Sequence, residues 1–468
     1  MRIGLIHPHS AIVARNRPMA EFMGRHPESF RPWMIPSLGL LTIAGMTPPD
    51  VELEYVDENV DPVDVDRPYG LVALSGMTQQ AFRAYELAAA FRRRGVHTVL
   101  GGAHATVMPE EAERYVDTVI AGEAEGVWEA FLADFSAGRP RRRYDGASLA
   151  EVNLTGSPRP RYDLLGPHFF KRGHGYKMIP VQTTRGCPRT CDFCSVPQVY
   201  GHAFRTKTVA QVVRDVEAAV AAAPGTLVLF ADDNMFINRR FARALLAAIA
   251  PLRIRYMAQS DIGVAQDPAL LRGIRDSGCI MMLVGLESLS EDTLKTVDAF
   301  KARACGGYEA GVRRIQEQGI AVLGAFIVGF DDDTPETFDR IADFCRRTHV
   351  FPQVTIATPL PRTGMTERLR AQGRLPAEAY WDRCTYYDAI VEPKGMTAAA
   401  LEAGIAALHE RLFSRDATRA RRAYFREVLR SVRARRPTSL GDRQFVAHSE
   451  PPNRRAAEPS NALLVSVA

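Results

Sequence analysis

Residues 184 to 194 read Thr184-Arg185-Gly186-Cys187-Pro188-Arg189-Thr190-Cys191-Asp192-Phe193-Cys194 and directly follow the apolar run Met178 to Thr183. Cysteines separated by three and then two residues can bring three thiolates to three irons of a cubane cluster. The fourth iron then stays open to bind another molecule. A structural zinc ion would need a fourth Cys or His, and His202 is the only local candidate. The spacing therefore predicts that Cys187, Cys191 and Cys194 hold a four-iron four-sulfur cluster.

The sequence after this loop alternates apolar strand-like runs with amphipathic helical segments. Six such units favour a partial (β/α)6 barrel over residues 175–363, in which chemistry sits at the carboxyl ends of the strands. The predicted strands are Met178 to Thr183, Leu227 to Ala231, Arg255 to Ala258, Met281 to Gly285, Ala321 to Val328 and Gln353 to Ala357. The predicted helices between them are Val209 to Ala222, Arg240 to Ile249, Pro268 to Asp276, Tyr308 to Gln318 and Pro335 to Arg347.

The sequence before the loop shows a second alternating series. Strands rich in Val, Leu and Ile, separated by helical segments, indicate a parallel sheet that is covered on both faces. This pattern predicts a doubly wound, Rossmann-like α/β domain over residues 1–137 and a linker over residues 138–174. The predicted strands are Arg2 to His7, Val51 to Val56, Leu71 to Ser75, Thr98 to Gly102 and Thr118 to Gly122.

The C-terminal part carries the positive charge of the chain. Ten arginines stand against Asp416 and Glu427 between Arg411 and Arg436, whereas the net charge of the whole chain is +5. Residues 1 to 410 therefore have no basic excess, which argues against a nucleic-acid partner. We expect a helical region over residues 364–437, with the arginines on a solvated face, and a disordered tail over residues 438–468.

Composition places the chain among soluble globular proteins. Its 468 residues, 46% of them hydrophobic, are too many for one typical core. No apolar run reaches the roughly 18 residues of a membrane span, and the N-terminus enters a strand rather than a signal peptide. We therefore expect a cytoplasmic protein, in which seven cysteines would not form a disulfide framework.

Polar residues follow the predicted barrel strands where each strand ends. Asp232 and Asp233 come after the second strand, and carboxylates in that position can accept hydrogen bonds from an ammonium group. Ser260 and Glu287 follow the third and fourth strands. An acid at such a position can also serve as the N-cap of the next helix, and an isolated glutamate on a loop is usually only solvated.

These features together resemble the radical S-adenosylmethionine (SAM) superfamily, whose signature is this three-cysteine loop after the first barrel strand. The resemblance implies that the open iron chelates SAM, which the reduced cluster cleaves to methionine and a 5′-deoxyadenosyl radical. It implies an electron donor such as flavodoxin or ferredoxin. By the same resemblance Asp232 or Asp233 receives the SAM amino group. The other implied SAM contacts are Phe193 and Gly324 beside adenine, Ser260, and Glu287 on the ribose.

Three turns of the first domain carry a second resemblance, to the cobalamin-binding domain of one radical SAM subfamily. Each turn follows a predicted strand, where open α/β folds bind ligands. The Asp-x-His-x-x-Gly motif that supplies a histidine to cobalt in other cobalamin proteins is absent. We therefore place His104 at a turn and do not assign it as a cobalt ligand. The implied cobalamin contacts are Ser75, Gly76, Thr78, Gly101, Gly102, His104, Gly122 and Glu123.

The combined resemblance implies a cobalamin-dependent methylase acting on an unactivated carbon of a small molecule. Residues 194–208 are reminiscent of hopanoid methylases and bacteriochlorophyll-pathway enzymes, which suggests a lipid, a tetrapyrrole or a natural product as substrate. The alternatives are a cobalamin-dependent radical cyclase or rearrangement enzyme, an enzyme whose first domain has lost cobalamin, and a non-enzymatic iron-sulfur sensor or scaffold. The sequence assigns no catalytic side chain. Trp381, Tyr386, Tyr387 and Asp388 could face substrate or simply pack together.

Overall fold

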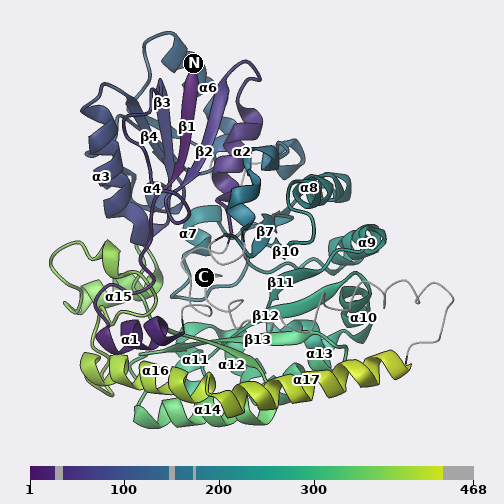
Figure 1. Cartoon of the computed structure of the whole chain (residues 1–468). Coiled ribbons are helices and arrows are strands. Elements are labelled where there is room, and N and C mark those ends of the chain that lie inside the picture. The colour runs from purple at the N-terminus through teal and green to yellow at the C-terminus, as the bar shows by residue number, and fades with distance from the viewer. Residues whose placement is uncertain (27–34, 147–152, 172–174, 436–468) are drawn as a thin grey trace.

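The computed structural model of the protein is built around two six-stranded parallel sheets (Figure 1). The structure describes residues 1–26, 35–146, 153–171 and 175–435, so the predicted disordered tail lies outside the described residues. The predicted fold class is confirmed: a doubly wound α/β domain precedes a partial (β/α)6 barrel, and helices follow. Among the described residues, no helix combines the length and the apolar character that crossing a membrane requires.

The first sheet has the strand order β2-β1-β3-β4-β5-β6, and all its pairs are parallel. The order reverses between β1 and β3, and ligands bind beside the carboxyl ends of strands at such a switch point. The strands are β1 (Arg2–His7), β2 (Glu52–Asp57), β3 (Leu71–Ser75), β4 (His97–Gly101), β5 (Thr118–Ala121) and β6 (Arg143–Asp145). The helices are α1 (Arg17–Arg25), α2 (Leu38–Met46), α3 (Ala81–Arg92), α4 (Ala103–Val107), α5 (Pro109–Ala112) and α6 (Trp128–Ser136).

The stretch that we predicted to be a linker contains β6, which pairs with β5 and extends the first sheet. The strand has only three residues, Arg-Tyr-Asp, so it lacks the apolar run that would reveal it in the sequence. Further along, Tyr162 is buried and its hydroxyl donates to Pro180 O at 2.7 Å. This segment is therefore packed onto both sheets rather than merely joining them.

The second sheet has the order β14-β13-β12-β11-β10-β7, with every pair parallel, as a partial barrel requires. Its strands are β7 (Met178–Val181), β10 (Leu227–Phe230), β11 (Tyr256–Ser260), β12 (Cys279–Glu287), β13 (Ala321–Val328) and β14 (Phe351–Ile356). The helices between them are α8 (Val209–Ala222), α9 (Arg239–Ile249), α10 (Pro268–Asp276), α11 (Glu291–Val297), α12 (Ala299–Ala304), α13 (Tyr308–Gln316) and α14 (Pro335–Thr348). Figure 1 shows α8, α9 and α10 side by side along the outer face of this sheet.

The cysteine loop is closed at its base by a two-stranded antiparallel ribbon, β8 (Thr184–Arg185) and β9 (Arg205–Thr206). Helix α7 (Val196–Tyr200) lies within the loop. Gly186 has a φ of +83°, and a Cβ there would come within 2.2 Å of Ala203 O. Only glycine therefore lets the chain turn from the ribbon into the cysteines.

The C-terminal region holds α15 (Gly364–Ala371), α16 (Ala398–Leu412) and α17 (Arg415–Arg435). Helix α1 leaves the first sheet and packs on α16, with the Phe22 ring 5.6 Å from the His409 ring. The arginine-rich α17 crosses the base of the barrel (Figure 1), where Tyr424 stacks on His349 at 4.4 Å, just before β14 begins. This helix therefore lies at the opposite end of the strands from their carboxyl ends.

Candidate active site

One cavity of about 600 Å³ lies where the carboxyl ends of the two sheets face each other. From the barrel it is lined by Cys187, Cys191, Cys194, Phe193, Asp233, Ser260 and Glu287, and from the first domain by Ser75, Gly76 and Gly102. Residues that the sequence analysis assigned to two separate cofactors therefore share one space. Four predicted residues lie outside the lining of this and the neighbouring cavity: Asp232, Gly324, Thr78 and His104.

The three cysteines of the loop are partly buried and form no disulfide. Burial raises the pKa of all three thiols, that of Cys194 to about 12. Within the described ranges, no three His, Cys, Asp or Glu side chains converge on a point that one metal ion could fill. A cubane cluster needs no such point, because each thiolate binds a different iron. The donor set therefore suits a cluster better than a single zinc ion.

Asp232 anchors the start of the cysteine loop instead of facing the cavity. Its Oδ1 accepts hydrogen bonds from the backbone N–H of Thr183 at 2.9 Å, from that of Thr184, and from Thr184 Oγ1 at 2.8 Å. The side chain is fully buried, and burial raises its pKa to about 6. The sequence left open whether Asp232 or Asp233 receives the SAM amino group. Since Asp232 is engaged by the loop, Asp233 is the better candidate.

Asp233 faces the cavity. Burial, with a smaller contribution from the charge of Asp232, raises its pKa to about 7. A buried carboxylate gains most from a cation, and an ammonium group supplies both the charge and the hydrogen-bond donors. Asp233 is therefore the acid that could receive the SAM amino group.

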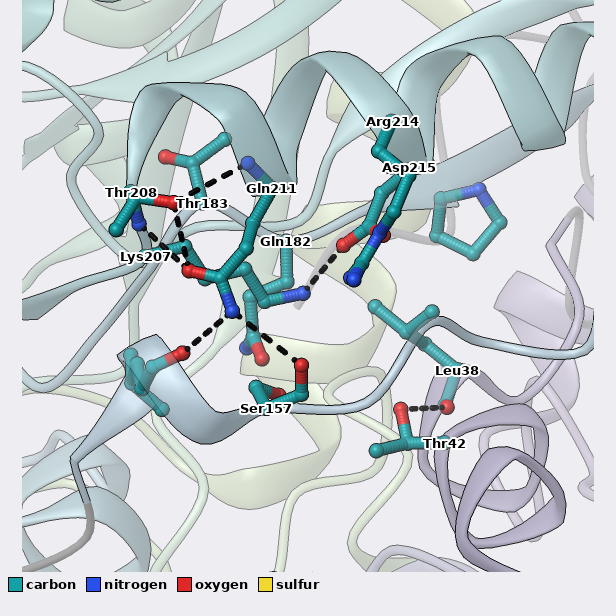
Figure 2. Close-up of polar contacts among 12 residues, drawn as sticks. Leu38, Thr42, Ser157, Gln182, Thr183, Lys207, Thr208, Gln211, Arg214 and Asp215 are labelled. Atoms are coloured by element: carbon teal, nitrogen blue, oxygen red, sulfur yellow. Dashed lines mark hydrogen bonds and ion pairs between the residues drawn. The ribbon is translucent and has the colours of Figure 1, made fainter.

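The far end of the loop is held by contacts of Lys207 and of the first turns of α8 (Figure 2). Lys207 N donates to Thr183 O at 2.9 Å, and its buried Nζ pairs with Asp215 Oδ2 at 2.8 Å. Thr208 caps α8 by accepting a hydrogen bond from Gln211 N, and Gln211 Nε2 donates to the carbonyls of Thr155 and Ser157. Both ends of the cysteine loop are thus fixed to the barrel.

A second set of charged groups lines the cavity on the side of β11 and β12. Arg189, which lies between the first two cysteines, pairs with Asp261 at 2.8 Å and lies 3.5 Å above the Phe300 ring. Glu287 has a φ of +64° and forms a buried ion pair with Lys301 of α12. Phe193 and Ser260 also line this cavity, and their predicted contact with SAM stays a prediction.

Gly324 does not reach the cavity. A Cβ at this position would instead meet Leu286, Phe326 and Val350. Side chains alternate between the two faces of a strand, so its neighbour Ala325 lines the cavity. Gly324 therefore does not line the cavity as predicted, whereas the small residue next to it does.

A smaller cavity of about 180 Å³ adjoins the first one at the carboxyl ends of β3, β4 and β5. Ser75, Gly101, Gly102, Gly122 and Glu123 line it, and these are five of the eight predicted cobalamin contacts. Gly102 has a φ of +90°, and a Cβ there would lie 2.7 Å from Ser75 Oγ. The glycines thus keep open a cradle that larger side chains would fill, which fits an extended cofactor.

Two of the predicted cobalamin contacts, Thr78 and His104, lie outside both cavities and have structural roles. His104 is buried, and its Nε2 lies 2.9 Å from Tyr85 Oη and 3.5 Å from Glu111 Oε1. Its ring also packs against Trp381 at 5.7 Å. Thr78 is buried at the start of a short 3-10 helix. The decision not to assign His104 as a cobalt ligand agrees with this placement.

Glu123 lines the smaller cavity, but both of its carboxylate oxygens accept hydrogen bonds from arginines of the β8–β9 ribbon at the base of the cysteine loop. Oε2 accepts from Arg185 at 2.5 Å, and Oε1 accepts from Arg205. Arg185 also donates to Glu125 Oε1 at 2.5 Å. These buried ion pairs join the first domain directly to the strands that precede and follow the cysteines.

The sequence analysis missed Lys301 and Arg185, because each is defined by a partner that is distant in the chain. It left Tyr386 undecided between a substrate-facing and a packing role. The structure places Tyr386 in the cavity wall. The other three residues of that group are buried away from the cavity: Trp381, Tyr387 and Asp388.

Comparisons with known proteins agree with this geometry. The radical SAM superfamily matches residues 181–345, and the B12 binding domain matches residues 34–132. Bacteriochlorophyllide d C-8(2)-methyltransferase of Chlorobaculum tepidum is 30% identical over 74% of this chain and 78% of its own. Hopanoid C-2 methylase of Rhodopseudomonas palustris is 27% identical over 73% of this chain and 65% of its own.

The fold also matches a solved structure, that of the radical SAM methyltransferase TsrM from Kitasatospora setae with cobalamin and a [4Fe-4S] cluster bound. The TM-score is 0.59 at 17% sequence identity, over 89% of this chain and 86% of that one. The chain therefore belongs to the cobalamin-dependent radical SAM enzymes, which use a [4Fe-4S] cluster, SAM and cobalamin as cofactors.

Proposed function

We propose that this enzyme transfers a methyl group to an unactivated carbon of an apolar, ring-containing small molecule, with a tetrapyrrole as the first candidate. The observation that carries the proposal is the single cavity lined by the three cysteines, by Asp233 and Glu287, and by the turns of the first domain. When bound, the cofactors supply a 5′-deoxyadenosyl radical from one side and a methyl group from the other. A substrate between the two sheets would be accessible to both.

The residues of the chain then take separate roles. Cys187, Cys191 and Cys194 hold the cluster, and Asp233 accepts the ammonium group of SAM. Glu287 has a carboxylate that can accept hydrogen bonds from ribose hydroxyls, and its ion pair with Lys301 holds it at the cavity wall. Asp232 and Glu123 act at a distance, because they position the loop on which the cysteines lie.

The charges in the cavity support an apolar substrate. In the described part of the lining, the lysine and the arginine are each already paired with a carboxylate, Lys301 with Glu287 and Arg189 with Asp261. Much of the remaining wall is apolar, including Leu229, Leu283, Ile327 and Ile356. An anionic group at the reacting end of the substrate would therefore find no unpaired cation on this wall.

The substrate names of the relatives point the same way. One relative is named for a bacteriochlorophyllide and the other for a hopanoid, and both molecules are rigid apolar ring systems. We favour the tetrapyrrole because the bacteriochlorophyllide methyltransferase has the higher identity and is spanned more fully. Electrons for SAM cleavage would come from a small redox protein such as flavodoxin or ferredoxin.

The test is anaerobic reconstitution of the full chain with cluster and cobalamin, followed by incubation with methyl-labelled SAM and a reductant. Bacteriochlorophyllide d and a hopanoid serve as separate probes. We expect deoxyadenosine, S-adenosylhomocysteine and a labelled methyl group on the tetrapyrrole. Deoxyadenosine without S-adenosylhomocysteine would instead indicate a cyclase or rearrangement enzyme, and methylation of the hopanoid alone would move the substrate to lipids.

A further inference from the structure

Tyr386 lies beyond the barrel in sequence but forms part of the wall of the larger cavity. Its backbone carbonyl accepts a hydrogen bond from Ile356 N, at the carboxyl end of β14, at 2.7 Å. Its side chain packs beside the core of the first domain. Tyr386 therefore stands at the junction of barrel, first domain and cysteine loop.

The backbone of Tyr386 is held in an unfavourable conformation. Its φ is +67°, in the left-handed region that side chains other than glycine seldom adopt. The flanking residues fix it there. Asp388 is buried, and its carboxylate accepts from the backbone N–H of Ala14, Arg15 and Asn16 and from Thr385 Oγ1. Asn16 Nδ2 donates to Tyr387 O at 2.7 Å.

Strained backbone of this kind collects at functional sites, where the surrounding structure holds a side chain in a set direction. The side chain so directed is a phenol, and no hydrogen-bond partner for its hydroxyl occurs within the described ranges. A phenol can donate a hydrogen bond, and Tyr386 belongs to the lining of the cavity.

We propose that Tyr386 is a positioning residue whose hydroxyl donates a hydrogen bond to a neutral oxygen of the substrate. The oxygen that accepts this bond belongs to a carbonyl or hydroxyl group of the substrate. A charged oxygen is disfavoured, because much of the cavity lining is apolar and Lys301 and Arg189 are already paired. The bond would fix which carbon faces the radical, and so would set the site of methylation. This inference rests on the proposed methyl transfer, and it adds the residue that orients the substrate.

The test compares Tyr386→Phe with Tyr387→Phe in the reconstituted full chain. Each variant loses one phenolic oxygen, but Tyr387 is buried away from the cavity, with its ring 5.9 Å from that of His409. The probe is whichever of bacteriochlorophyllide d and the hopanoid the unsubstituted enzyme methylates. In Tyr386→Phe we expect the deoxyadenosine formed per methylated product to rise about three- to tenfold, the effect of one lost hydrogen bond. Deoxyadenosine formed without substrate should not change, and Tyr387→Phe should match the unsubstituted enzyme.

If Tyr386→Phe forms no more deoxyadenosine per methylated product than the unsubstituted enzyme, the proposal is overturned. Thermal unfolding gives a second reading that needs no substrate. A hydroxyl that bonds only substrate can be removed without lowering the unfolding midpoint, whereas a drop of several degrees would show a structural bond and also overturn it. Absence of methylation of either probe by the unsubstituted enzyme would contradict the proposed function instead, and a lowered unfolding midpoint of Tyr386→Phe would still overturn the role of Tyr386.

Discussion

Arg185 of the cysteine loop donates to Glu123 of the first domain at 2.5 Å, although the two residues are 62 positions apart. The side chains of Arg185 and Glu123 are 8% and 2% exposed, so this pair lies in the interior of the protein. The loop that carries the cysteines is therefore bonded directly to the domain that forms the smaller cavity.

We expect Glu123→Ala to destabilise the protein by about 3 kcal/mol, because it removes the carboxylate that the buried guanidinium groups of Arg185 and Arg205 share. The matched control is Glu110→Ala, whose exposed pairs with Arg143 and Arg362 should contribute no more than about 1 kcal/mol. Thermal unfolding of both variants measures the difference. Equal midpoints would show that the buried pair does not fix the loop to the first domain.

The two adjacent acids after β10 should behave differently. Asp232→Asn should lower the iron content after reconstitution, because a neutral amide oxygen accepts the hydrogen bonds from Thr183 and Thr184 more weakly than a carboxylate does. Asp233→Asn should keep its iron and bind SAM about tenfold more weakly, since a charge-assisted hydrogen bond contributes roughly 1.5–3 kcal/mol. Iron assay and equilibrium dialysis of SAM separate the two effects, and the reverse pattern would exchange the assigned roles.

The difference between these acids shows what the sequence could and could not predict. Strand positions were predictable from apolar runs, and the cysteines from their spacing, because both signals are local. The direction of a side chain at a strand end depends on register, so Asp232 and Gly324 were both assigned to the cavity although each faces elsewhere. Contacts between distant residues, such as those of Glu123 and Lys301, leave no local signal.

Gly102→Ala should reduce the amount of cobalamin that stays bound after gel filtration, measured by visible absorption. A Cβ at this position would lie 2.7 Å from Ser75 Oγ and 3.0 Å from Gly76 O, inside the cradle between the two cavities. Gly95→Ala is the matched control, because Gly95 also has a positive φ, of +75°, but nothing lies within 4 Å of its Cβ position. Both variants place a Cβ on a backbone with positive φ and are therefore strained. Equal loss of corrinoid in both would show that strain, not crowding, is responsible.

Acidification should destabilise the contact between α1 and α16 through His409. Burial lowers the pKa of His409 from 6.5 to about 4, so the folded protein keeps this ring neutral. Below pH 6.5 the unfolded chain takes up a proton that the folded protein does not, so the free energy of unfolding falls as the pH drops toward 4. The loss is about 3 kcal/mol at most.

In His409→Phe this contribution disappears, while the ring contact with Phe413 can be kept. Unfolding by urea at pH 7 and pH 5 should therefore show a smaller difference in the variant than in the unsubstituted protein. An unchanged difference would mean that His409 is protonated without cost in the folded state.

The central claim is that cluster and corrinoid face each other across one cavity, and electron paramagnetic resonance tests it most directly. The sample is the full chain loaded with cobalamin and its cluster, with both centres brought to their paramagnetic states. We predict that the cluster and cobalt signals are mutually broadened, and that the cluster signal sharpens in a sample without cobalamin. Two independent, unbroadened signals would place the cofactors in separate sites and contradict the account.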